Sequence, residues 1–254
     1  TLFWNSQSPA EKEHIIAAFQ FELSKVVVPS IRQRVVDNLA HVDPKLARKV
    51  AEPLGIGAPD PRAAAGRSGF RDARFKLPIE ASATLSMETA GGPIQTRKVA
   101  ILVADGVDGA PLLKLHAALT DAGAVPRFVG PRLGSFSTTS GATIEADASM
   151  ENSPAVLFDA LVLPSGEAAV KTLGSLGQTM EFVTNQYRHG KAILALGSSR
   201  SLLGDASIPA PRKGGKADAG LLPMQGTESD LAERFIAAIA AHRFPERETD
   251  PPAV

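Results

Sequence analysis

The chain has 254 residues, of which 44% are hydrophobic and 21% are charged, so it is long enough to bury a sizeable core in one or two modules. Its 27 basic side chains balance 27 acidic ones, and this neutrality argues against nucleic-acid binding, which requires clustered excess Lys and Arg. Cysteine is absent, which excludes a disulfide framework, a thiolate metal site and a cysteine nucleophile.

The two ends of the chain and its apolar runs bear on its location. No apolar run approaches the roughly 20 residues that span a bilayer, and no signal peptide opens the chain. We therefore expect a cytoplasmic protein without membrane contact. Because the chain begins at Thr1 rather than at a methionine, we also expect it to be a fragment.

Residues 1–57 carry the pattern of three short amphipathic helices. The first begins at Ser8-Pro9-Ala10-Glu11, a capping box with proline at the first helical position. Pro29 ends it, and the dipeptide Asp43-Pro44 begins the third helix, which stops at Gly55. Apolar residues recur at helical spacing throughout: Ile15, Ile16, Phe19, Leu23, Ile31, Val35, Leu39, Val42, Leu46, Val50 and Leu54. With Phe3 and Trp4 ahead of them, these helices have too little mass to enclose a core, so we expect the edge of a larger domain.

Residues 58–95 lose this periodicity and predict an extended linker that lies on other surfaces. Glycines and prolines interrupt the segment, and residues 83–89 are compatible with one short strand. The Arg and Phe residues between Phe70 and Phe75 allow two interpretations, a nucleic-acid patch or the anchors of a wrapping arm. Zero net charge favours the arm.

From residue 96 onward the pattern predicts a doubly wound α/β sheet. Four apolar runs have the character of strands buried on both faces: Val99–Ala104, Val125–Val129, Ala160–Leu163 and Ala192–Leu196. A crossover helix closed by Gly123 joins the first two runs, and residues 135–146 predict a small hairpin. Residues 179–189 predict another helix, residues 209–220 a polar loop, and a closing helix ends near His242.

Two sets of residues resemble the large-subunit haem catalases. Residues 2–25 (LFWNSQSPAEKEHIIAAFQFELSK) and 42–51 (VDPKLARKVA) resemble the last helices of the catalase core. Residues 85–87 (LSM), 99–108 (VAILVADGVD) and 240–243 (AAHR) resemble the linker and C-terminal domain of these enzymes. The resemblance implies a tetrameric hydroperoxidase whose C-terminal domain is flavodoxin-like and similar to the DJ-1/PfpI and class I glutamine amidotransferase superfamily. We therefore expect core helices at 1–57, a linker at 58–95 and a flavodoxin-like domain at 96–254.

The same resemblance implies that haem belongs to the parent catalase and not to this chain. Catalases bind the iron through a tyrosine in an Arg-x-x-x-Tyr context, opposite a distal histidine and asparagine, all upstream of the helices seen here. The single tyrosine, Tyr187, lies in the different context NQYRH. We interpret it as an ordinary amphipathic ring with its hydroxyl near water.

In the DJ-1-like and amidotransferase proteins, a cysteine occupies the sharp turn after a strand. The matching turn here places Gly197 at the nucleophile position, and the partner acid expected after the first strand falls near Pro111. Ser198 and Ser199 do not replace the nucleophile, because the sequence departs from G-x-S-x-G and no base follows. We interpret them as caps of the next helix at a degenerate nucleophile elbow.

Three carboxylates follow predicted strands: Asp105, Asp108 and Glu167. Asp105 and Asp108 would repel a flavin phosphate. All three carboxylates allow either a metal site or solvated and helix-capping roles, and we favour the latter. We thus expect no catalytic, cofactor-binding or metal-binding residue in the chain itself.

These observations predict the C-terminal part of a catalase that decomposes hydrogen peroxide to water and oxygen. The chain alone is expected to be a non-enzymatic stabilising, oligomerisation or chaperone-like module. Its partners are then the rest of the catalase chain, the other subunits of the tetramer, and unfolded proteins. The alternative is a free-standing DJ-1-like hydrolase or glyoxalase, which the missing cysteine and Gly197 disfavour.

Overall fold

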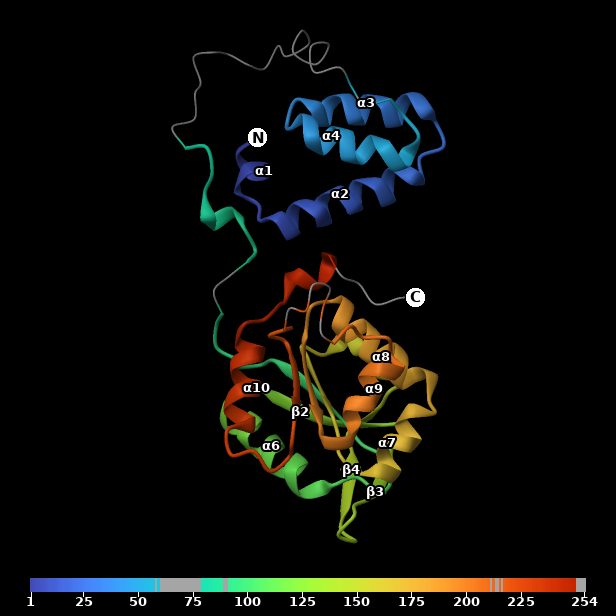
Figure 1. Cartoon of the computed structure of the whole chain (residues 1–254), viewed down its shortest axis with the longest axis vertical. Coiled ribbons are helices and arrows are strands. Elements are labelled where there is room, and N and C mark those ends of the chain that lie inside the picture. Colours follow the sequence, from blue (N-terminus) through green and yellow to red (C-terminus); the bar gives the residue numbers. More distant parts are fainter. Residues whose placement is uncertain are drawn as a thin grey trace. The chain divides into compact units, whose positions relative to one another are not determined.

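The computed structural model describes residues 1–57, 59, 79–88, 91–210, 212, 215 and 217–249. The chain divides into two compact units, Thr1–Glu88 and Thr89–Val254, and each is described here by itself (Figure 1). The Arg and Phe patch around residues 70–75 lies outside the described residues. The three-part division at residues 57 and 95 stays a prediction.

The first unit is helical, and local capping explains where its helices begin. Its elements are α1 (Leu2–Ser6), α2 (Pro9–Ser24), α3 (Pro29–Ala40), α4 (Pro44–Ala51), η1 (Glu52–Leu54) and η2 (Ala83–Leu85). The predicted capping box is confirmed: the Glu11 backbone N–H donates to Ser8 Oγ at 3.2 Å, and the Ser8 N–H donates to the Glu11 carboxylate at 2.9 Å. The carboxylate of Asp43 accepts from the Lys45 and Leu46 N–H groups and caps α4 in the same way.

The helical unit has a small core of its own, so the expectation that it cannot enclose one was wrong. Ten apolar residues are buried together: Trp4, Ile16, Leu23, Val36, Leu39, Ala40, Leu46, Ala47, Val50 and Ala51. The physical reason is α4, whose buried face contacts both α2 and α3. Other apolar side chains, Phe3 and Phe21 among them, remain exposed.

Residues 82–88 are held against the helices of this unit by hydrogen bonds to the side chains of Ser6, Gln7 and Glu11. The Ser82 N–H donates to Ser6 Oγ at 2.9 Å, and Gln7 Nε2 donates to the Leu85 carbonyl at 2.8 Å. The Met87 N–H donates to Glu11 Oε1 at 2.6 Å. Because side chains satisfy this backbone, the segment forms the 3₁₀ turn η2 and not the strand considered for residues 83–89.

The second unit is the predicted α/β fold. Its six-stranded sheet has the order β5-β2-β1-β6-β7-β8, with all neighbouring strands parallel. The strands are β1 (Lys98–Leu102), β2 (Val125–Gly130), β5 (Ala148–Ser149), β6 (Ala160–Leu163), β7 (Ala192–Leu196) and β8 (Leu221–Met224). Without the two-residue β5, this is the 2-1-3-4-5 order of flavodoxin-like folds, and the predicted fold class is confirmed.

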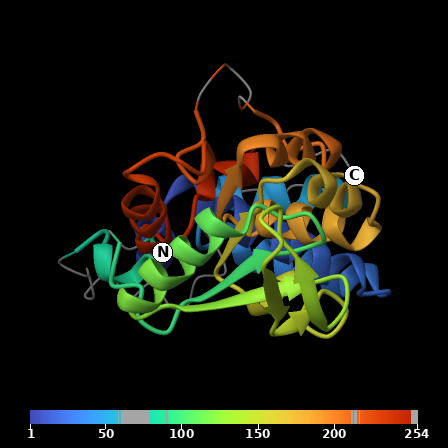
Figure 2. The ribbon, with the colours of Figure 1, turned by 90° about the horizontal axis from the view of Figure 1, so that it is seen from below.

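Helices cover both faces of the sheet (Figures 1 and 2). Helices α6 (Gly109–Asp121) and α10 (Leu231–Ala240) pack together on one face, and α7 (Glu167–Gly174), α8 (Gly177–Arg188) and α9 (Arg200–Asp205) pack on the other. Helix α6 stops as predicted, with Gly123 at φ +83° just past its end. The hairpin of β3 (Gly134–Ser137) and β4 (Thr143–Ala146) extends from the unit, also as predicted.

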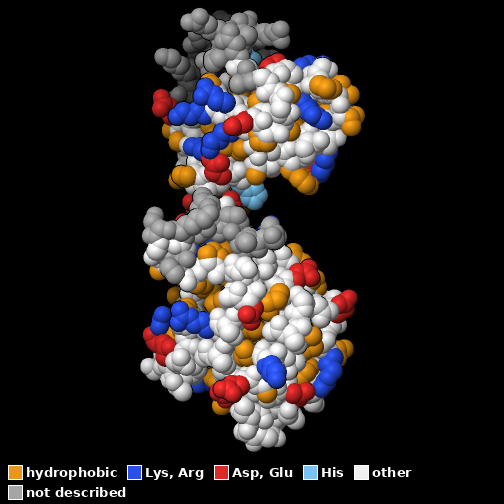
Figure 3. All heavy atoms as spheres, turned by 45° about the vertical axis from the view of Figure 1, so that its right-hand side comes forward, with side chains coloured by type: hydrophobic (Ala, Val, Ile, Leu, Met, Phe, Trp, Pro, Cys, Tyr) orange, Lys and Arg blue, Asp and Glu red, His pale blue; other side chains and the backbone are white. Residues whose placement is uncertain are grey.

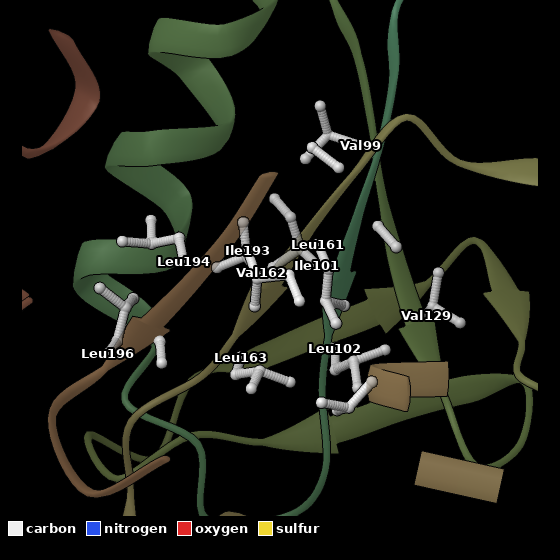
Figure 4. Close-up of a cluster of buried hydrophobic side chains, with 14 of the residues drawn as sticks. Val99, Ile101, Leu102, Val129, Leu161, Val162, Leu163, Ile193, Leu194 and Leu196 are labelled. Carbon is white, nitrogen blue, oxygen red and sulfur yellow. The ribbon is translucent and has the colours of Figure 1, made fainter. Parts of the chain in front are cut away.

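The main core lies on the central strands. Val99–Ala104, Ala160–Leu163 and Ala192–Leu196 are almost completely buried, and Figure 4 shows Ile101, Leu161, Val162 and Ile193 lying together across neighbouring strands. Each such side chain stabilises the fold by about 1.5–3 kcal/mol on leaving water. Within the described residues, no helix has both the length and the apolar character needed to cross a membrane.

Candidate functional site

The loops that follow β1, β6 and β7 meet at the carboxyl edge of the sheet, where open α/β folds place ligands. The Asp108 N–H donates to the Ser165 carbonyl at 2.9 Å, and Ser165 Oγ donates to the Asp108 carboxylate at 3.4 Å. Gly166 has φ +111°, and a Cβ atom built there lies 2.4 Å from the Gly106 carbonyl oxygen. Only glycine therefore allows the two loops to approach this closely.

Gly197 occupies the turn directly after β7 and has φ +53°. It opens the 3₁₀ turn η4 (Gly197–Ser199), which leads into α9. A Cβ atom built at Gly197 lies 3.3 Å from Ser165 Cβ and 3.8 Å from Gln225 Oε1. The backbone thus has the sharp strand-to-helix turn of a nucleophile elbow, but no side chain is present to attack a substrate.

Among the described residues, no basic side chain hydrogen-bonds to either of the two neighbouring serines. Ser198 is exposed, whereas Ser199 is buried, and its hydroxyl donates to the carbonyl oxygens of Leu196 at 2.9 Å and Leu163 at 3.1 Å. The interpretation of Ser199 as a side-chain cap of α9 was wrong, because its hydroxyl points back to the strands. His189 and His242 lie at the opposite edge of the sheet from these serines. His189 precedes β7, and the segment after His242 lies beside it because the Phe244 N–H donates to the Gly190 carbonyl.

The three predicted carboxylates do not form a common site. Asp105 accepts hydrogen bonds from the Ser137 N–H at 2.8 Å and Ser137 Oγ at 2.9 Å, and these bonds hold its pKa below the ordinary value. Asp105 thus binds Ser137 of the β3–β4 hairpin, whereas the Asp108 carboxylate accepts a hydrogen bond from Ser165 Oγ. Glu167 is the first residue of α7. Among the described residues, no group of three histidines and carboxylates is arranged to hold a metal ion.

Tyr187 does not have the environment expected from the sequence. It is completely buried rather than near water, and the Arg247 guanidinium lies 4.6 Å from its ring centroid. A haem ligand needs an open face on which the macrocycle can lie, whereas this ring is enclosed by α8 and the C-terminal segment. The residues around Tyr187 therefore do not fit haem.

The sequence analysis did not predict two buried cationic side chains, Arg247 and Lys191. The side chain of Arg247, in η5 (Pro245–Thr249), forms a bidentate ion pair with Asp218 at 2.7 and 2.9 Å and donates to the Lys191 carbonyl at 2.6 Å. Lys191 is itself buried, and its Nζ donates to the carbonyl oxygens of Ala155, Val156 and Phe158. A single charged residue in a polar segment carries no periodicity, so no sequence signal marks either burial.

Comparison with known proteins identifies the class of protein to which this fold belongs. Residues 95–249 match the family described as the C-terminal domain found in long catalases, and residues 1–54 match the family described as catalase-related immune-responsive. The chain therefore belongs to the long catalases, as a partial catalase chain that includes their C-terminal domain.

Curated relatives extend this match over the whole chain. It is 36% identical to catalase HPII of Pseudomonas putida over 100% of its length and 37% identical to catalase HPII of Mycobacterium avium over 98%. Catalase-B of Dictyostelium discoideum is 32% identical, also over 98%. The chain covers only 33%, 35% and 34% of these three proteins, so it spans about a third of the length of its relatives.

Proposed function

We propose that this chain forms the C-terminal third of a large catalase and acts there as a non-enzymatic module that stabilises the assembly. The complete protein would decompose hydrogen peroxide with haem held by upstream residues. Gly197 supports the non-enzymatic part, because a glycine provides neither nucleophile nor acid at the elbow. The environment of Tyr187 supports the upstream location of haem.

The observation that carries the proposal is the apolar surface of the helical unit. Phe21, Val27 and Val28 are 62%, 85% and 44% exposed, and they follow one another around the junction of α2 and α3. Figure 3 shows hydrophobic side chains interspersed with Lys and Arg on the surface of this unit. The three residues lie within eight positions of the sequence, and exposed apolar side chains that gather in a patch mark protein interfaces. We infer that this junction docks onto the upstream catalase chain or a neighbouring subunit.

The same surface supports a second candidate function, the capture of unfolded chains. A patch that binds through apolar contact selects partners by hydrophobicity, and unfolded proteins expose such side chains.

The cytoplasmic location and the tetrameric assembly expected from the sequence both remain predictions.

Sedimentation of the chain tests the docking proposal, with aggregation of an unfolded client protein as a second readout. We expect the chain to self-associate or to suppress aggregation, and a variant with Phe21→Glu and Val27→Glu to lose both properties. Leu113→Glu is the matched control, because Leu113 is 50% exposed on α6 of the other unit. Equal loss in the control variant, or a monomer that leaves client aggregation unchanged, contradicts the proposal.

Two activity measurements test the non-enzymatic part. After incubation with haemin, the chain should show no stoichiometric Soret band and no oxygen release from peroxide. It should also turn over neither small aldehydes nor esters. Hydrolysis that Ser198→Ala abolishes would overturn the proposal in favour of a DJ-1-like enzyme.

A further inference from the structure

A surface cavity of about 360 Å³ lies at the amino edge of the sheet, opposite the degenerate elbow. Lys98 and Val125, the first residues of β1 and β2, line it together with Arg127 and Asp147. Leu157 and Phe158, which precede β6, also line it. The volume lies near the lower end of the range of about 300–1,000 Å³ for small-molecule sites.

The charges that line the cavity leave one cation available. Asp147 is fully engaged, because its carboxylate pairs with Arg127 at 3.4 Å and accepts the Phe128 N–H at 2.8 Å. Asp159, next to Phe158, pairs with Arg97 at 3.5 Å and accepts the Lys98 backbone N–H at 2.9 Å. Within the described part of the chain, the Lys98 ammonium has no ion pair. The cavity therefore favours a ligand with one negative charge.

Part of the cavity lining is apolar, and Val125, Leu157 and Phe158 provide it. Phe158 is buried and provides the inner surface, while Leu157 is 50% exposed and forms the rim. An apolar rim of this kind gains free energy when a hydrocarbon group displaces water from it, at about 25 cal/mol per Å².

The rim is held rigidly by buried polar groups. Leu157 belongs to η3 (Ala155–Leu157), and Lys191 Nζ donates to the carbonyl oxygens of Ala155 at 3.2 Å and Val156 at 3.4 Å. Gln186 Nε2 also donates to the Ala155 carbonyl, at 2.6 Å. A rim fixed before binding loses little conformational entropy when a ligand arrives.

We propose that this cavity binds a medium-chain monocarboxylate. The carboxylate pairs with Lys98, and the hydrocarbon chain lies against Val125, Leu157 and Phe158. The proposal does not rest on the docking role of the helical unit, because all of these residues belong to the α/β unit.

Titration of the full chain with octanoate, followed by NMR, tests the proposal, and octan-1-ol is the uncharged counterpart. We expect saturable shifts confined to the amides around Val125, Ala148 and Phe158, with weaker binding of the alcohol. Lys98→Met should weaken octanoate binding about threefold to fivefold, as for a solvent-exposed charge pair. Leu157→Asp should abolish binding, because it replaces an apolar side chain of the rim with a carboxylate that repels the carboxylate of octanoate.

Two controls keep the result decisive. Lys114→Met removes an exposed lysine on α6 and should leave octanoate affinity unchanged, as should Leu113→Asp. Spectra of the variants away from the cavity report whether each one folds. Absence of saturable shifts overturns the proposal, as do equal affinities for octanoate and octan-1-ol or equal losses in the Lys98 and Lys114 variants.

Discussion

Arg247→Met should destabilise the α/β unit strongly. The Arg247 and Asp218 side chains are only 1% and 5% exposed, and the guanidinium also lies over the Tyr187 and Phe244 rings at 4.6 and 5.2 Å. Methionine fills much of the same volume but leaves the Asp218 carboxylate buried without its counter-ion. Breaking a buried pair from one side costs about 3–5 kcal/mol, which corresponds to a fall in Tm on the order of 10 °C.

The chain contains separate optical probes for its two units. Its single tryptophan, Trp4, reports the helical unit, and its single tyrosine, Tyr187, reports the α/β unit. In denaturant titrations, Arg247→Met should move the tyrosine transition and leave the tryptophan transition in place. The variant with both Arg247→Met and Asp218→Asn should recover part of the loss, because no unpaired charge remains. A loss below about 1 kcal/mol, or a double variant as unstable as the sum of the single ones, would refute the reasoning.

Three further predictions concern single residues. Glu11→Ala should cost the helical unit about 1–2 kcal/mol in denaturant titrations followed through Trp4, because it removes the carboxylate that accepts the Ser8 and Met87 N–H groups. Partial burial raises the pKa of Glu11, but hydrogen bonds from Ser8, Met87 and Ser86 outweigh it and hold the pKa below 4.5. The stability that they provide is therefore present above about pH 4.5 and lost on acidification, and Glu11→Ala should flatten this dependence. Gly197→Cys should give a thiol that reagents label rapidly, with no gain in esterase activity; esterase turnover would show that a base is in place. Burial, with Arg243 nearby, lowers the pKa of Lys191 to about 8 from 10.5. Unfolding free energies should thus rise between about pH 8 and pH 10.5, where the unfolded chain still holds the proton, and Lys191→Met should abolish the rise.

The central strands could be predicted because each is buried on both faces and forms an unbroken apolar run. The edge strands could not. Strand β5 has only two residues, and β8 contains Pro223, which a sequence pattern treats as a breaker. The sheet tolerates this proline because β8 lies at an edge, where one side of the backbone needs no partner. Edge strands of this kind become visible only when the neighbouring strand is known.

The helical unit shows a different limit. Each helix separately has too few apolar residues for a core. The core forms because α4 contacts both α2 and α3, and a pattern read one helix at a time does not contain these contacts. Residues 82–88 also pack here through hydrogen bonds to Gln7 and Glu11, which join residues more than 70 positions apart in the sequence. Local pattern therefore located the capped helices correctly but underestimated their packing.

At the candidate site, the sequence located the turn after β7 but not the surroundings of its serines. A capping role for Ser199 was plausible from residue type alone, since serine is common at helix starts. Only the three-dimensional positions of β6 and β7 reveal that two carbonyl groups accept its hydroxyl. The buried position of Arg247 was equally hidden, because the charge is neutralised by a residue 29 positions away.

The conformation of Gly197 bears on the stability of the turn after β7. A catalytic side chain at φ +53° carries backbone strain of about 1–3 kcal/mol, which is tolerated where it contributes to a reaction. Glycine at the same position adopts this φ without the penalty. Ser165 and Asp108 then bond to each other across the edge instead of facing a substrate. The turn after β7 therefore carries no backbone strain of this kind. An unstrained turn at this position is compatible with the non-enzymatic role that we propose for the chain.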